Sequence, residues 1–264
     1  MCGIAGLIHR GKKSDVGAEM TSMLQALKHR GPDSTGYAVY GAAGEGDYIM
    51  RFILAEQDAM TKSFDMKDKV AERLVEVEKR LALHGAVIKQ REHSTDYALR
   101  YVIQHDGDTE TLARHIEDVD GVEILSLGNS LELIKDLGDA SVVSEQYGLL
   151  DFSGTHGIGH TRMATESDVD IRSAHPYWAF PYNDVSVVHN GQITNYWLMR
   201  REMEHKGHRF TSSCDSELLA VYTAHNMSIG LTLEESLRSS ITDIDGVFTY
   251  LVATKDQLGM AKGT

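Results

Sequence analysis

Short β-rich runs, separated by stretches with helical periodicity, constrain the fold of this chain more than any other feature of its sequence. Several runs end at Gly or Asp, as turns require. The runs lie at Ile4–Ile8, Tyr37–Tyr40, Tyr48–Leu54, Leu99–Gln104, Val122–Leu127, Gly157–Arg162, Val185–His189 and Phe248–Ala253. Because strands and helices do not alternate strictly, the pattern predicts an α+β fold with mainly antiparallel sheets.

Apolar residues spaced three and four apart predict helices between these runs. The stripes lie within Met20–Leu27, Val70–Leu81 and Tyr196–Met203. Asn195 is a plausible N-cap for the third stripe. Thr232 and Glu235 form a capping-box pattern, which predicts that a further helix begins there.

The length of 264 residues is compatible with one large domain or two small ones. We expect one domain over residues 1–264, with residues from about 60 to about 150, rich in Asp, Glu and Lys, as an elaborated insertion within it. The seven residues between Tyr40 and Tyr48 are typical of a hairpin loop, so these two runs are expected to pair.

Charge and cysteine usage narrow the class of protein. With 26 Lys and Arg against 39 Asp and Glu, the net charge is −13, which disfavours nucleic acid and anionic membrane surfaces as partners. Two cysteines cannot build a disulfide framework. No apolar run approaches the roughly 20 residues that cross a bilayer. A cytoplasmic protein is expected.

Cys2 is the strongest candidate for a catalytic residue. Removal of Met1 would leave its thiol and a free α-amine on one residue, and that amine titrates near pH 8, so it can accept the thiol proton. This is the arrangement of an N-terminal nucleophile. The alternative is a small buried residue in a first strand.

Further segments have compositions suited to holding an amino-acid amide: Arg30–Gly36, Gly159–Thr165, Ser173–Pro176, His189–Gly191 and Ser213–Glu217. Arg162 ends a predicted strand and can clamp a carboxylate through two hydrogen bonds. Asn190 and Gly191 end another, where a side-chain amide and a backbone N–H can form an oxyanion hole. Asp215, at the start of a predicted helix, can pair with an ammonium group.

Together these ordered motifs resemble the glutaminase domain of class II glutamine amidotransferases, whose nucleophile is an N-terminal cysteine. The resemblance covers residues 1–40 and 155–255. It implies a four-layer αββα sandwich of two antiparallel sheets, the N-terminal-nucleophile (Ntn) hydrolase fold. It also implies hydrolysis of L-glutamine through a γ-glutamyl thioester.

The resemblance assigns a role to each matching residue. Cys2 would be the nucleophile, and Asn190 with Gly191 the oxyanion hole. The remaining residues would bind substrate: Arg162 the α-carboxylate, Asp215 the α-ammonium, and Thr165 and His175 on or beside the glutamine-covering loop.

The chain departs from the family pattern in three places. Met163 stands where many members carry Trp, and Ser173 replaces the usual Asn. The long separation of Cys2 from Arg162 is more like the amidotransferase domain of glutamate synthases or their stand-alone subunit relatives. An ammonia-accepting synthase subunit is therefore the expected partner, in a hetero-oligomer.

Other functions remain open at this stage. They are a glutaminase domain of a phosphoribosyl or hexosamine amidotransferase, a glutamine-sensing regulatory or assembly subunit, and an acylase acting on another amide. No cofactor is implied for this chain, although a partner synthase of this kind can carry a flavin. His156 and His160, four apart on a predicted strand, do not make a zinc-binding pair, and no metal site is expected.

Overall fold

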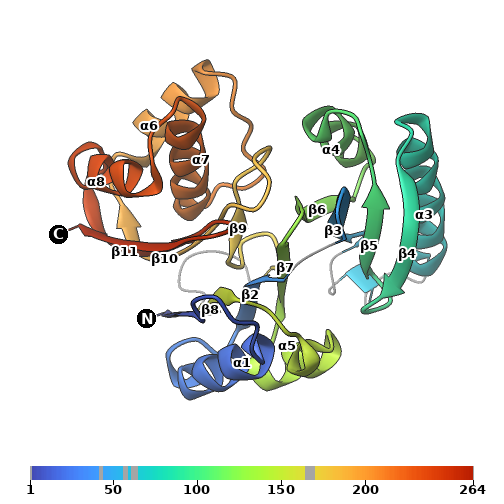
Figure 1. Ribbon diagram of the computed structural model, residues 1–264, viewed down its shortest axis with the longest axis horizontal. Helices are drawn as coiled ribbons and strands as arrows, with labels where there is room; N and C mark the ends of the chain where they lie inside the picture. Colours follow the sequence, from blue (N-terminus) through green and yellow to red (C-terminus); the bar gives the residue numbers. More distant parts are fainter. Residues whose placement is uncertain (1, 42–43, 56–58, 61–64, 164–169, 264) are drawn as a thin grey trace.

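The structure is a computed structural model that describes residues 2–41, 44–55, 59–60, 65–163 and 170–263. It contains three four-stranded sheets, and every paired strand among the described residues runs antiparallel to its neighbour. Two sheets stack on each other with helices on their outer sides, and the third lies beside them (Figure 1).

The first sheet has the order β1-β8-β2-β7, with β1 at Gly3–Ile8, β8 at His156–Arg162, β2 at Ser34–Tyr40 and β7 at Leu131–Leu137. Its outer face is covered by α1, Val16–Ala26, and α5, Ala140–Gln146. The apolar stripe of α1 buries Met20 and Leu24. Asp139 caps α5 by accepting from the N–H groups of Ser141 and Val142.

The second sheet has the order β12-β11-β10-β9, with β12 at Leu258–Gly263, β11 at Gly246–Ala253, β10 at Ser186–Ile193 and β9 at Tyr177–Trp178. Its outer side carries α6, Tyr196–His205, α7, Asp215–Ser228, and α8, Leu233–Asp243. Strands β10 and β11 pack against β1 and β8. The result is a helix–sheet–sheet–helix order (Figure 1).

The third sheet has the order β4-β5-β3-β6, with β3 at Asp47–Ile53, β4 at Val87–His93, β5 at Ala98–Gln104 and β6 at Glu123–Gly128. Helices α3, Met66–Leu83, and α4, Thr109–Glu117, accompany it. The sheet therefore begins and ends earlier than the segment from about 60 to 150 expected from the sequence. Strand β7 and helix α5 already belong to the first layer.

The predicted hairpin of Tyr40 with Tyr48 is wrong. Tyr40 ends β2, which is paired on both sides by β7 and β8, so no edge remains for β3. Strand β3 pairs instead with β5 and β6 in the third sheet. The capping box of Thr232 and Glu235 is confirmed at the start of α8.

Candidate active site

The predicted nucleophile lies where the first strand meets the end of β8. Gly3 pairs with Thr161, which brings Cys2 beside the strand end that carries Arg162. The half-buried Cys2 thiol lies 3.9 Å from the carbonyl oxygen of Met163. The backbone carbonyl of Cys2 accepts a hydrogen bond of 3.1 Å from Arg30 Nε.

Asn190 reaches the same residue from the second sheet. Its side-chain Nδ2 donates to the carbonyl oxygen of Cys2 at 3.1 Å. Residues 188 positions apart in sequence are thus joined, because β10 packs across β1. The side-chain amide of Asn190 therefore lies at the residue that carries the thiol, where a donor could serve an oxyanion hole.

Gly191 occupies a backbone position that only glycine fills easily. Its φ is +149°, and a Cβ there would lie 2.2 Å from the carbonyl oxygen of Val247. Gly191 therefore lets β10 approach β11 closely immediately after Asn190.

A cavity of about 800 Å³ opens between β10, α6 and the start of α7. Its volume is in the range of small-molecule sites. It is lined by Ser173, Gly191, Gln192, Ile193, Thr194, Tyr196, Trp197, Ser213, Cys214 and Asp215. Of the predicted site residues, Gly191 and Asp215 line it.

Asp215 is the first residue of α7, and its side chain is 24% exposed. Its Oδ2 accepts from the N–H of Ile193 at 3.0 Å, which holds the carboxylate against β10. Arg162, the last residue of β8, is buried, and its carbonyl accepts from the N–H of Asp33. A buried guanidinium at a strand end and a carboxylate in a cavity are suited to the two charges of an α-amino acid.

His175 is buried and stacked on His160, with ring centroids 4.1 Å apart. Burial lowers the pKa of His160 to about 3 and also lowers that of His175, so both rings are neutral at pH 7. Through Nε2, His160 donates to the carbonyl of His189 at 3.1 Å. His175 does not line the cavity, and Thr165 lies outside the described residues.

Two polar residues beside the site were not singled out from sequence. His189 precedes Asn190, and Ser216 follows Asp215; their side chains lie 2.8 Å apart. Their only signal in the sequence is that each adjoins a predicted site residue.

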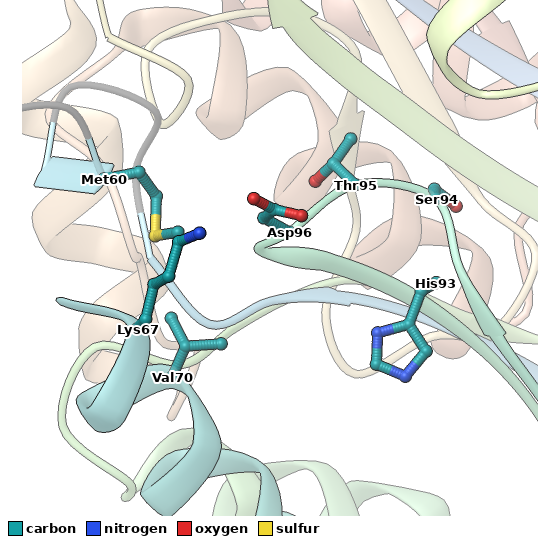
Figure 2. A pocket seen from close by; sticks show the side chains of 7 residues that line it. All are labelled: Met60, Lys67, Val70, His93, Ser94, Thr95 and Asp96. Atoms are coloured by element: carbon teal, nitrogen blue, oxygen red, sulfur yellow. The ribbon is translucent and has the colours of Figure 1, made fainter.

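A second cavity, of about 450 Å³, lies between α3 and the turn from β4 to β5 (Figure 2). Lys67 and Asp96 face each other across it, and it contains none of the predicted site residues. In the part of the chain that the structure describes, no three His, Cys, Asp or Glu side chains are grouped as a metal site. No helix there has the length and apolarity to span a membrane.

The sequence matches known families at both ends. Two family models, both described as glutamine amidotransferase domains, match residues 1–127 and 160–262. The "Putative glutamine amidotransferase" of Methanothermobacter thermautotrophicus is 40% identical over 265 residues, covering 99% of this chain and 84% of that protein. The glutamine amidotransferase-like protein GlxB of Rhizobium meliloti is 32% identical, covering 99% of this chain and 82% of that protein.

Other similarities are partial. The glutamine–fructose-6-phosphate aminotransferase of Thermococcus kodakarensis is 32% identical over 130 residues, 49% of this chain and 21% of that enzyme. A solved structure of glutamine phosphoribosylpyrophosphate amidotransferase from B. subtilis aligns with a TM-score of 0.52 at 15% identity. It covers 99% of this chain, which spans only 36% of that one.

The structure of an allosteric regulatory enzyme of purine biosynthesis aligns with a TM-score of 0.56 at 16% identity, over 37% of its length. At these identities the alignments concern the fold, and they confirm the predicted Ntn-type sandwich of antiparallel sheets. The near full-length match to the M. thermautotrophicus protein concerns the family. The chain belongs to the glutamine amidotransferases.

Proposed function

We propose that this chain hydrolyses L-glutamine with Cys2 as an N-terminal nucleophile. The observation that carries the proposal is the 3.1 Å contact between Asn190 Nδ2 and the Cys2 carbonyl, which brings an oxyanion donor to the thiol-bearing residue. Arg162 would bind the α-carboxylate of glutamine and Asp215 its α-ammonium. Thr165 and His175 would belong to the loop that covers the substrate.

The reaction runs in two steps. The free α-amine of Cys2 takes the thiol proton, and the thiolate attacks the γ-amide carbon of glutamine. Asn190 Nδ2 and the N–H of Gly191 stabilise the oxyanion, and one such donor is typically worth about 3 kcal/mol. The amide nitrogen takes the proton and leaves as ammonia. Water then hydrolyses the γ-glutamyl thioester to glutamate and restores the thiol.

We further propose that the ammonia passes to a separate synthase subunit, in the manner of glutamate synthases. Two observations support a subunit of this kind. The two relatives matched over 99% of this chain are covered to 84% and 82% of their own length, whereas the glutamine–fructose-6-phosphate aminotransferase is covered to only 21%. The third sheet also adds a large unit beside the two-sheet sandwich (Figure 1).

A glutamine-mimicking electrophile tests the nucleophile. After incubation with 6-diazo-5-oxo-norleucine, we expect a single adduct by intact mass, mapped to an N-terminal peptide that begins at Cys2. Cys2→Ala is expected to abolish labelling and glutaminase activity. Cys214→Ala is the matched control and is expected to be labelled normally, since burial raises the pKa of the Cys214 thiol.

Other outcomes would contradict the proposal. Labelling that persists in Cys2→Ala would assign the nucleophile elsewhere. A chain that retains Met1, escapes labelling and still binds glutamine would be a glutamine sensor rather than an enzyme. Full activity of Arg162→Ala on free glutamine would remove the substrate assignment.

A further inference from the structure

A series of side-chain hydrogen bonds joins β10, which carries Asn190 and Gly191, to α7, which begins at Asp215. His189 Nδ1 lies 2.8 Å from Ser216 Oγ, and Ser216 Oγ donates to Asp215 Oδ1 at 3.3 Å. Because the serine proton goes to the carboxylate, the imidazole must donate to the serine oxygen. The order of donors is therefore His189, Ser216, Asp215.

These hydrogen bonds attach to β10 on both sides of the predicted oxyanion hole. Asp215 Oδ1 is tied through Ser216 to His189, immediately before Asn190. Asp215 Oδ2 accepts from the N–H of Ile193, two residues after Gly191. One carboxylate thus holds both ends of the segment 189–193. The distance between the Asp215 carboxylate and the oxyanion hole is therefore set by hydrogen bonds.

The ring of His189 is placed to hold Ser216 and Asp215 at a fixed distance from β10. It is nearly fully buried, and its Nε2 lies 3.0 Å from where a Cβ on Gly191 would be. Burial lowers the pKa of His189, although Asp215 opposes the shift. A neutral ring leaves the charge of Asp215 available for a substrate ammonium, whereas an imidazolium 3.7 Å away would compete for it.

We propose that His189 and Ser216 are positioning residues that fix the spacing between the ammonium-binding carboxylate of Asp215 and the oxyanion hole. The proposal rests on the proposed function. In glutamine a short carbon chain separates the α-ammonium from the γ-amide. A carboxylate held at the matching distance from Asn190 and Gly191 would select that substrate and align its amide with the Cys2 thiol.

Ser216→Ala tests the link with two substrates. Glutaramate carries the same primary amide and carboxylate as glutamine but lacks the α-ammonium. We expect Ser216→Ala to lower kcat/KM for glutamine about tenfold, mainly through KM. The same variant should leave kcat/KM for glutaramate unchanged, since that substrate does not use Asp215.

Two controls separate positioning from folding. Ser236→Ala removes another fully buried serine, which lies on α8 and accepts from Asn226 near the C-terminal end of α7. This variant should change kcat/KM for neither substrate. In an Asp215→Asn background, Ser216→Ala should cost nothing further, because both act through one carboxylate.

A parallel loss on both substrates, or no loss on either, would overturn the positioning role. Additive losses in the double variant would overturn it too. The wild-type chain is assayed in the same series. An inactive wild type would contradict the proposed function itself, whereas an active wild type with parallel losses would contradict only the link.

Discussion

Two features of Gly191 exclude a side chain: its positive φ and the atoms that lie close to its Cα. Its φ of +149° is unfavourable for any residue with a side chain, and a Cβ would meet Val247 O at 2.2 Å and Phe248 Cα at 2.6 Å. Gly191→Ala must therefore push β10 away from β11 at the proposed oxyanion donor. We expect kcat for glutamine to fall at least about 100-fold, the typical effect of losing one such donor.

Gly230→Ala is the matched control for this prediction. Gly230 also has a positive φ, +101°, but a Cβ there would meet nothing within 4 Å. We expect it to lose about 1 kcal/mol of stability from backbone strain and to keep its activity. Steady-state kinetics and thermal unfolding of both variants would decide. Equal kcat values in the two variants would mean that the close approach at Gly191 has no bearing on the reaction.

At this scale the sequence predicted the residues with distinctive chemistry and missed those that support them. Cys2 and Asn190 were singled out because an N-terminal thiol and an Asn-Gly pair suggest a reaction, and they lie together. His189 and Ser216 are ordinary in sequence. Their importance depends on a contact between β10 and α7 that only the packing of that helix on its sheet creates.

At the scale of elements, prediction succeeded for only some of the buried strands. Strand β7 was not predicted although six of its seven residues are buried, because charged residues interrupt its apolar pattern. All seven residues of β2 are buried, and the sequence predicted the second part of this strand, Tyr37–Tyr40. Strand β4 was missed because it is an edge strand with mostly exposed, charged residues, so no alternation marks it. The pairing of β3 was wrong because loop composition does not reveal that β2 has no free edge.

Glu117, the last residue of α4, gives a prediction about how the third sheet contacts the loop before α7. Its side chain is 6% exposed, and burial raises its pKa to about 7, although Arg209 at 3.9 Å opposes the shift. The folded chain thus holds this proton more tightly than the unfolded one. Stability from Glu117 is present at low pH and is lost as pH rises from about 4.5 to about 7.

Glu117→Gln should remove the loss of stability that the wild type shows as pH rises, because glutamine does not ionise. We expect its free energy of unfolding to match that of the wild type near pH 4.5 and to exceed it above pH 7 by up to about 3 kcal/mol. Urea titrations at pH 4.5, 6 and 8 measure the difference. Arg209→Ala should do the opposite and destabilise the chain most at pH 8. A difference between Glu117→Gln and wild type that does not vary with pH would contradict a raised pKa.

At the scale of the whole molecule, the third sheet is joined to the sandwich through a buried charge network. Glu132 on β7 accepts from Arg51 on β3 at 2.7 and 2.9 Å and from Arg100 on β5 at 2.8 and 2.9 Å. Burial by itself would raise the pKa of Glu132, but the two guanidinium groups outweigh it and hold the pKa below its usual value. One carboxylate thus bridges two cations between separate sheets, and Arg100 also lies 3.6 Å from Glu92.

Removing the negative charge of Glu132 should destabilise the contact between the third sheet and the sandwich. Glu132→Gln leaves two largely buried guanidinium groups without their shared anion, a change that typically costs about 3–5 kcal/mol. Glu234→Gln is the control, because its pair with Arg238 is about three-quarters exposed on both sides and such pairs contribute under about 1 kcal/mol. We expect urea unfolding to show the large loss only in Glu132→Gln. Hydrogen exchange should accelerate first in β3 and β5, since these strands lose their tie to β7. If both variants unfold alike, the third sheet is held by its apolar contacts with the sandwich and the network only fills the space between them.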